Sequence, residues 1–477
     1  MRHCLAIAPP LARLGAALIA ISAIVAFALP GAAAGDTSPP LLIKNVRPVD
    51  ARGGARPLTD VLIRDGRIAV IGKDIAAPIN VTVMEGGGRF LAPGLWDMHV
   101  HFTYDARFTD LMADLFLDYG ITSVRDTGGV LDLLLHVIQR MENSAAPTPR
   151  VFFAGPLLDG DPVVYDGDHA PLLGVENANA DAARANVDRL AAAGVDFIKI
   201  YEMVSPEVFS ALVDAASRHA LPIAAHIPLS LTASTAGPQV QSMEHLRNIA
   251  MDCARDSEAL LDARRARLTG PASSGYALRS ELHGAQRDSA IGNEDTERCT
   301  AVLQALRNTI QVPTARLNAM TQFPPFANAA WEGALARLPT EVAADWARAP
   351  QLLDESAFAV LGQWTLQMLP RLRDAGVPVG AGTDTPIGWS VPGHSLHSEL
   401  EIFVAAGLST SEALESATVV PARFFGLDSE LGLVAEGYLA DLLLLEASPL
   451  ADISNTRRIA AVIAGGRIAR GQALIAR

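Results

Sequence analysis

The stretch LAPGLWDMHVHF, Leu91–Phe102, is apolar as far as Trp96 and then carries two histidines separated by one residue, His99 and His101. In an extended strand, residues two apart point to the same face and lie roughly 6.6 Å apart along the chain. That spacing allows two imidazoles to converge on one metal ion. The alternative for this stretch alone is a pair of partly buried histidines that bond to backbone at a strand end. The rest of the chain decides between the two.

Eight strand-like segments alternate with helix-like segments along most of the chain. Amphipathic helices are expected between them, for example over residues 181–194 and 411–426. Eight strands alternating with helices are typical of a (β/α)8 TIM barrel, so we expect an α/β fold with the barrel over residues 91–426. The strand-like segments are residues 97–102, 121–126, 150–155, 195–201, 222–227, 241–246, 309–314 and 377–384.

Residues 35–90 and 427–477 have a different character. They contain short alternating runs with turn signals, such as VLIRDGRIAVIG (61–72). We expect both ends of the chain to fold together into a small β-sandwich beside the barrel. Two long connections, 247–308 and 315–376, leave the face of the barrel where active sites lie, and should form a helical lid or a pocket wall.

Residues 1–34 have the pattern of a secretory signal peptide. A basic start precedes the apolar run 14–30, and Ala32 and Ala34 satisfy the small-x-small rule for cleavage. We therefore expect a secreted or periplasmic protein with no membrane association after cleavage. The alternative is an uncleaved anchor, because the run approaches the short limit for a membrane span.

The chain is acidic, with 52 Asp and Glu against 38 Lys and Arg and a formal charge of −14. Phosphate backbones and anionic lipid repel such a chain, so nucleic acid and membrane surfaces are poor partners. Beyond the signal only Cys253 and Cys299 remain. One disulfide between them would fit an oxidising compartment, and two unrelated thiols are the alternative.

Ionisable side chains stand at the carboxyl ends of several predicted strands, within apolar or small-residue runs. An ionisable group in such a place is costly unless it is paired or bound to metal. Six of them at one end of one barrel favour a metal site. They are His99 and His101 on the first strand, Lys199 on the fourth, His226 on the fifth, His245 on the sixth and Asp384 on the eighth.

Lys199 is the most informative of these residues, because the chain has only two other lysines, Lys44 and Lys73. Strand alternation places it on the same face as Phe197 and Tyr201, so it should point into the barrel. A buried lysine shifts its pKa readily, and its neutral amine can add CO₂ to become an anionic carbamate. The alternative is an unmodified lysine in a salt bridge. Beside four histidines we favour the carbamate.

Eight motifs together resemble the amidohydrolase superfamily, in its branch with two metals and a carboxylated lysine. The chain is most similar to secreted prolidase-like members, which are related to Xaa-Pro dipeptidases and imidazolonepropionase. The motifs follow the expected order over residues 40–477. They are PGLWDMHVH (93–101), GITSVRDTGG (120–129), GVDFIKIY (194–201), PIAAHI (222–227), SMEHL (242–246), VPVGAGTDTP (377–386), HSLHSELEIFVAAGLSTSEALESAT (394–418) and GLVAEGYLADLLLLEASPLADI (432–453).

The resemblance implies two divalent metal ions. His99, His101 and Asp384 would bind the first, His226 and His245 the second, and Lys199, modified to N6-carboxylysine, would bridge both. Zinc is the expected ion, because the ligands are imidazoles and oxygens, and manganese, cobalt and iron are the alternatives. Asp384 would act as general base and then general acid for a hydroxide that bridges the metals.

Four residues are candidates for binding substrate, each with a structural alternative. Tyr201 follows Lys199 on the same strand face, or packs at the barrel rim. Arg125 lies at the end of the second strand, and its structural alternative is an ion pair with its neighbour Asp126. His169 lies in the loop after the third strand, and His397 follows the eighth, near a helix start.

We therefore expect an enzyme that hydrolyses an amide or peptide bond in small molecules, such as dipeptides (including Xaa-Pro) or N-acyl amino acids. A lactonase or esterase on the same site is the close alternative. A heterocycle deaminase is another, although relatives of that kind often lack the strand-four lysine. A non-catalytic scaffold would have lost ligands, and none is lost here. The sequence leaves open the substrate, the metal and whether the chain forms a homo-oligomer.

Overall fold

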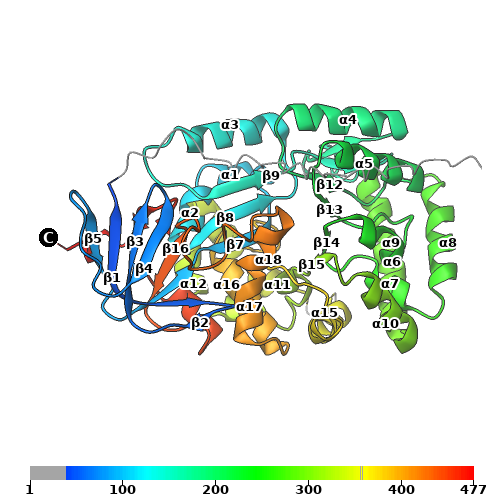
Figure 1. The fold of residues 1–477 in the computed structure, drawn as a ribbon. Helices are drawn as coiled ribbons and strands as arrows, with labels where there is room; N and C mark the ends of the chain where they lie inside the picture. Colours follow the sequence, from blue (N-terminus) through cyan, green and yellow to red (C-terminus); the bar gives the residue numbers. More distant parts are fainter. Residues whose placement is uncertain (1–38, 355, 357, 477) are drawn as a thin grey trace, which may run out of the picture.

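The computed structural model describes residues 39–354, 356 and 358–476. The expected signal sequence, 1–34, lies outside the described residues, so its cleavage stays a prediction. Across the described ranges, no helix combines the length and the apolar character needed to cross a membrane. Figure 1 shows a β-rich end, on the left, beside a larger body of strands and helices.

Strands from the two ends of the chain pair in one sheet at this β-rich end. Strand β6 pairs in parallel with β1, where Phe90 lies opposite Arg47, and antiparallel with β16, where Leu91 lies opposite Leu444. The sandwich architecture and the boundaries after residues 90 and 426 stay predictions. The nine strands are β1 (Leu41–Asp50), β2 (Gly54–Ala55), β3 (Thr59–Arg64), β4 (Arg67–Gly72), β5 (Thr82–Glu85), β6 (Phe90–Pro93), β16 (Leu442–Leu445), β17 (Ile459–Ala464) and β18 (Arg467–Arg470).

Side-chain alternation and one tight turn explain this sheet. Ile63 of β3 and Leu444 of β16 are buried in one apolar cluster that both chain ends build. The β3–β4 hairpin turns at Asp65 and Gly66, whose φ angles are 51° and 70°. Two consecutive positive φ angles are what a type I′ hairpin turn requires.

The larger body contains parallel strands in two sheets. One sheet has the order β7-β8-β9, and the other has the order β11-β10-β12-β13-β14-β15. Seven of the eight predicted strand segments contain or overlap a strand. The bounds are β7 (Leu95–Val100), β8 (Ile121–Asp126), β9 (Arg150–Phe153), β10 (Leu157–Asp159), β11 (Gly174–Glu176), β12 (Ile198–Ile200), β13 (Ile223–Ala225), β14 (Ser242–Glu244) and β15 (Ile310–Val312).

The eighth predicted strand, residues 377–384, is not a regular strand but lies between the two sheets. Isolated parallel bridges join Val379 to Gln311 of β15 and Thr385 to Val100 of β7. The approach to β7 is so close that a Cβ on Gly382 would lie 2.9 Å from the Cβ of His99. The body is therefore mixed α/β with its parallel strands in the order a barrel needs, and closure of that barrel stays a prediction.

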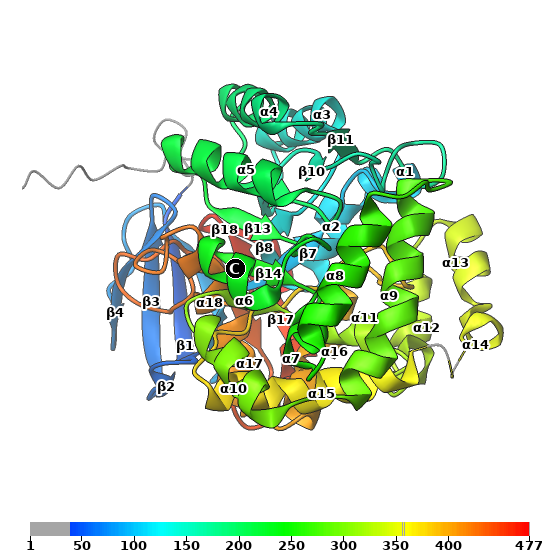
Figure 2. The same ribbon diagram turned by 90° about the vertical axis from the view of Figure 1, so that its right-hand side faces the viewer.

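Helices connect the strands and fill both long connections, as expected. Figure 1 shows α3 and α4 along the top of the strands, and Figure 2 shows α8 and α9 side by side in front. The helices are α1 (Ala106–Thr109), α2 (Met112–Asp118), α3 (Leu131–Glu142), α4 (Ala180–Ala192), α5 (Pro206–Arg218), α6 (Ala233–Ala236), α7 (Ile249–Cys253), α8 (Ser257–Leu268), α9 (Gly275–Gly292), α10 (Thr296–Ala305), α11 (Ala315–Asn318), α12 (Trp331–Leu335), α13 (Thr340–Trp346), α14 (Ala349–Leu352), α15 (Ala359–Asp374), α16 (His394–Ala405), α17 (Thr410–Ser416) and α18 (Val419–Phe424).

One predicted helix is divided in two. The sequence predicts a single helix over 411–426, whereas the structure has α17 and α18, separated at Thr418 with φ −135° and ψ −71°. Pro421 gives the physical reason, because it has no N–H to continue the hydrogen bonds of α17 and its ring clashes with the preceding turn.

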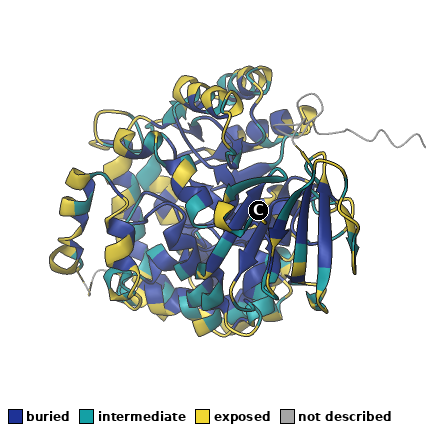
Figure 3. Cartoon of the chain, turned by 90° about the vertical axis from the view of Figure 1, so that its left-hand side faces the viewer, coloured by how far each residue is buried: buried dark blue, intermediate teal, exposed yellow. Residues whose placement is uncertain are grey.

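A packed apolar cluster lies below the polar ends of the strands. Trp96 and Phe152 stack with ring centroids 5.0 Å apart, and Phe425 lies 4.3 Å from Phe152. Phe197 belongs to the same cluster, whereas Ile198 belongs to the outer one that faces the helices. Figure 3 shows the strands buried and the outer helix faces exposed. This packing supports the polar residues at the strand ends.

Cys253 and Cys299 form a disulfide between the end of α7 and α10. The sequence left open a bridge or two free thiols, and the structure has the bridge. It closes a segment with a sequence separation of 46 residues. By loop-closure entropy, such a cross-link stabilises the folded chain by about 4 kcal/mol.

Candidate metal centre

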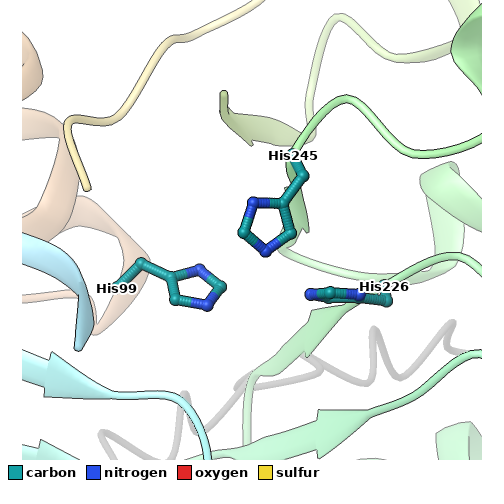
Figure 4. A group of neighbouring side chains, drawn as sticks. All are labelled: His99, His226 and His245. Carbon is teal, nitrogen blue, oxygen red and sulfur yellow. The ribbon is translucent and has the colours of Figure 1, made fainter. Parts of the chain in front are cut away.

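Five of the predicted ligands converge at the carboxyl ends of the parallel strands. Figure 4 shows the rings of His99, His226 and His245 turned toward one another. Two overlapping groups each have ligand atoms that all lie within 4.8 Å of one another: His99 with His101 and Asp384, and His99 with His226 and His245. All five residues are almost fully buried.

Strand ends and strained turns bring these residues together. His226 directly follows β13, and His245 directly follows β14. His245 and Asp384 have φ angles of 58° and 60°. The left-handed conformation costs a non-glycine residue roughly 1–2 kcal/mol, and such strain is found mainly where function requires it.

Each of the four imidazoles has its Nδ1 bound to an acceptor outside the centre. Carbonyl and carboxylate oxygens can only accept a hydrogen bond, so an Nδ1 atom that bonds to one of them carries the proton. The hydroxyl of Thr314 uses its own hydrogen to donate to Pro313 O, so it too accepts from the Nδ1 of His245. The Nε2 lone pairs are left for the centre, which is how metal-binding histidines are usually oriented. The pairs are His99 with Glu244 (2.7 Å), His101 with Gly128 O (2.7 Å), His226 with Glu202 (2.8 Å) and His245 with Thr314 Oγ1 (2.6 Å).

Asp384 adds a carboxylate to these lone pairs. Its Oδ1 lies 3.1 Å from His101 Nε2 and 3.3 Å from His99 Nε2. Burial raises the pKa of Asp384, but His99 and His101 outweigh this effect and hold it at about 2. Burial lowers the pKa of His99 to about 4, and it also lowers that of His245 well below its usual range. A carboxylate and several neutral imidazoles that face one another need a cation between them, so the donor set fits divalent metal.

Lys199 lies on β12 with 1% of its surface exposed. Within the described residues its Nζ has no hydrogen-bond partner. Burial is the main cause that lowers its pKa to about 8, with Arg125 adding to the effect and Glu244 opposing it. A buried amine without a partner, with a lowered pKa, fits a lysine that becomes a carbamate.

A second carboxylate, Glu202, supports the centre from beneath His226. It binds His226 Nδ1, Arg279 Nε at 2.9 Å and His283 Nε2. Burial raises the pKa of Glu202, but Arg279 and His283 more than offset it and keep the pKa well below its usual range. Since Arg279 and His283 belong to α9, the long connection 247–308 is tied to the metal centre.

Arg125 occupies a fully buried position below His99. It donates to Glu244 Oε1 and to Ser242 Oγ, each at 2.8 Å, and to Met98 O at 2.7 Å. Glu244 in turn accepts from His99. Through Glu244, Arg125 therefore helps to hold the ring of His99 in its orientation, and its side chain does not face an open pocket.

The other predicted substrate residues lie at different distances from the centre. The Tyr201 ring is buried with its centroid 4.5 Å from that of His226. His169 is exposed and bonds to Asp166 at 2.8 Å. His397 is buried but bonds to Thr456 Oγ1 and Tyr119 O, each at 2.9 Å, and neither group belongs to the ligand set.

Glu202, Glu244, Arg279 and His283 are the supporting residues that the sequence did not reveal. Strand alternation would put Glu244 on the face opposite to His245, but β14 ends at Glu244 and the chain then turns. The motifs KIYE and SMEH do place both acids next to ligand positions, which was an available signal. The contacts of Arg279 and His283 span 77 and 81 residues and left no local signal.

Comparison with known proteins gives three kinds of similarity. Residues 334–469 match the amidohydrolase family. A deacetylase from Brucella anthropi is 35% identical over 108 residues, or 21% of this chain and 26% of that protein. A putative prolidase from Bifidobacterium longum has a similar structure, with a TM-score of 0.64, 24% identity and coverage of 90% of this chain and 94% of that one. A Xaa-Pro dipeptidase structure with bound methionine has a TM-score of 0.63, 18% identity and coverage of 90% and 99%.

These findings confirm the resemblance to amidohydrolases, with prolidases and Xaa-Pro dipeptidases among the structures that share the fold. The similarity to solved structures extends over most of the chain, but the chain spans only about a quarter of the length of the curated deacetylases that it matches. Similarity therefore shows the fold, and the activity must be argued from the metal centre.

Proposed function

We propose that this chain is a metal-dependent hydrolase that cleaves an amide or peptide bond in a small molecule. One observation carries the proposal: four imidazoles and the Asp384 carboxylate form two overlapping groups of possible ligands that share His99, and each imidazole Nδ1 is bound outside them. The similarity to a deacetylase and to prolidases supports N-acyl amino acids and dipeptides as substrates. The proposal also includes two structural features: a closed (β/α)8 barrel over residues 91–426, and a flanking β-sandwich built from residues 35–90 and 427–477.

Two divalent ions, with zinc as the expected metal, would be held by the converging residues. His99, His101 and Asp384 would hold the first ion, and His226 and His245 the second. When bound, such ions polarise a carbonyl and lower the pKa of water by many units. Lys199 would join the ions after its neutral amine adds CO₂ and releases one proton.

Asp384 would transfer the proton during the reaction. Its low pKa keeps it as a carboxylate at neutral pH, ready to accept a proton from water and to return it to the leaving nitrogen. Tyr201, beside His226, would donate a hydrogen bond to the substrate or its oxyanion. The buried apolar interior below the centre would exclude water from the far side.

We also propose that the protein acts outside the cytoplasm. The signal-like pattern of residues 1–34 and the disulfide between Cys253 and Cys299 support export, because disulfides persist in oxidising compartments.

Metal analysis and a substrate panel test the function. We expect about two metal ions per chain, and turnover of members of a dipeptide and N-acyl amino acid panel. A parallel ester and lactone panel identifies the leaving group, and faster turnover there would replace amide hydrolysis with the lactonase or esterase alternative.

The variant Asp384→Asn tests the role in proton transfer. The fold should remain, and kcat should fall by about 10²–10⁴. Near-ultraviolet circular dichroism checks the fold. Turnover at the normal rate would remove Asp384 from the proposed mechanism.

A further inference from the structure

Thr314 and the short helix α11 that follows it, together called the α11 segment, hold one of the proposed metal ligands. Thr314, with a φ angle of 46°, accepts a hydrogen bond from His245 Nδ1 at 2.6 Å. Asn318, at the end of α11, donates to the backbone oxygen of His245 at 3.3 Å. The α11 segment therefore contacts both the ring and the backbone of this ligand.

Arg316, in the same segment, holds the turn that carries a second proposed ligand, Asp384. Its guanidinium donates to Thr383 O at 3.0 Å, to Ile387 O at 3.1 Å and to Gly388 O. The first of these oxygens belongs to the peptide bond that precedes Asp384. A planar guanidinium presents five donors in a fixed arrangement, so one side chain can hold three carbonyl groups at set positions.

Both the guanidinium and the backbone of Arg316 are fixed in the protein interior. Arg316 is 4% exposed, and burial lowers its pKa to about 10, so it stays charged at neutral pH. The buried carboxylate of Glu399, on α16, accepts from Ala315 N at 2.8 Å and from Arg316 N at 2.6 Å. Figure 1 shows α11 and α16 beside each other. The α11 segment is thus anchored to a longer helix at the point where it contacts the two ligands.

We propose that Arg316 is a positioning residue that keeps Asp384 and His245 in a fixed relation, and so joins the two proposed metal positions. Asp384 belongs to the first position and His245 to the second, and His245 Nε2 lies 4.0 Å from Asp384 Oδ2. Both residues have left-handed φ angles, which are unfavourable by themselves and persist only where surrounding contacts hold them. This inference rests on the proposed function, because it concerns the ligands of the metal centre.

Hydrogen exchange of the full chain, with metal and again after chelation, tests the positioning itself. Arg316→Met removes the donors, and we expect peptides over 383–388 and 245–248 to exchange at least roughly tenfold faster, since a hydrogen bond to a charged group contributes about that factor or more. The second peptide is decisive, because Arg316 reaches it only through the α11 segment. Arg150→Met, at a half-buried arginine that pairs with Asp441 at 2.8 Å, is the control and should leave both peptides unchanged.

Metal competition with a chelator and steady-state kinetics test the consequence for the centre. Arg316→Met should bind metal about 10–100-fold more weakly, as is usual when an outer partner of a metal site is lost. We expect kcat to fall by a larger factor than KM rises, because the buried guanidinium acts through the turn. Arg316→Lys should recover part of the affinity, since an ammonium keeps the charge and donates to fewer carbonyls. A merely structural role would lower the melting temperature and leave metal affinity below that temperature unchanged.

Glu399→Gln decides the question if Arg316→Met does not fold. Its amide nitrogen cannot accept, so one N–H of the α11 segment loses its partner while the Arg316 side chain remains. The same two peptides should exchange faster, whereas Glu401→Gln, on the same helix but paired with Arg457 at 2.6 Å, should leave them unchanged. Faster exchange over 383–388 alone, or no change in either peptide, would overturn the positioning role. An unaltered protein that binds no metal would instead overturn the proposed function, on which the exchange result does not depend.

Discussion

At the scale of single residues, Lys199 is the group whose environment is hardest to explain without a ligand. Its amine is buried and has no hydrogen-bond partner within the described residues. A permanently charged ammonium in such a place would be costly, whereas a carbamate would carry the opposite charge and bind cations. Lys199 is therefore the residue whose modification the proposed function most needs.

Replacing Lys199 by alanine should remove most of the bound metal and nearly all turnover. Metal content by atomic emission and kcat on the best panel substrate are the measurements. Short carboxylates with added divalent metal should restore part of both. Lys73→Ala is the matched control, because Lys73 is exposed near the end of β4. Unchanged metal content in Lys199→Ala would refute the bridging role.

Glu202 provides a second test at this scale, because it acts through His226. Glu202→Gln keeps an acceptor for His226 Nδ1 but removes the charge that Arg279 and His283 face. Outer partners of metal-binding histidines change metal affinity by about 10–100-fold, so we expect a loss of that size. The measurement is metal binding in competition with a chelator. Glu207→Gln, on the exposed start of α5, is the control and should have normal affinity.

At the scale of elements, Asp196 joins two strands by reciprocal hydrogen bonds. Its carboxylate accepts from Phe153 N at 2.9 Å, and its own N–H donates to Phe153 O at 3.0 Å. Burial raises the pKa of Asp196 to about 7, opposed by the bond from Phe153 N–H. An unfolded aspartate has a pKa of about 3.9. Between these values the folded chain binds a proton that the unfolded chain does not, so this group makes stability fall as pH rises from about 4 to 7.

Asp196→Asn should remove that dependence. The melting temperature of the variant minus that of the unaltered protein should be more positive at pH 8 than at pH 5. The measurement is the melting temperature of both proteins at both pH values. Asp132→Asn, at an exposed position on α3, controls for the loss of one acid. Equal pH profiles for the unaltered protein and Asp196→Asn would contradict the role of burial at this position.

The elements also show where sequence patterns succeed. Segments such as ITSVRD predict β8 in full, because Ile121, Thr122 and Val124 are β-branched residues that favour strands. Residues 377–384 do not form a regular strand, because Gly380 and Gly382 permit close approach to β7 and Pro378 has no N–H to donate to a ladder. The sequence predicted one strand over 150–155, which contains β9, and none over Leu157–Asp159, where β10 pairs with β11 and β12.

At the scale of the whole molecule, the convergence of His99, His101, His226, His245 and Asp384 was predictable, because parallel strands end at one edge and residues at strand ends become neighbours. The supporting residues were not, because Glu202 meets Arg279 and His283 only after the 247–308 connection folds back over the strands. Arg125 and His397 are the opposite case, because the sequence suggested a role that their contacts in the structure do not support. Their places near predicted strand ends suggested substrate binding, but buried partners elsewhere use their hydrogen bonds.

Because the ligands come from β7, β13, β14 and the 377–384 segment, bound metal should stabilise the whole body. A ligand at 1,000 times its dissociation constant adds about 4 kcal/mol to the free energy of unfolding. Chelation should therefore lower the melting temperature, and zinc should restore it. Lys199→Ala should respond much less than the unaltered protein, since it lacks the bridging group. If chelation removed the metal and left the melting temperature unchanged, the four imidazoles and Asp384 would be held in place by packing alone, and metal would not be part of the folded architecture.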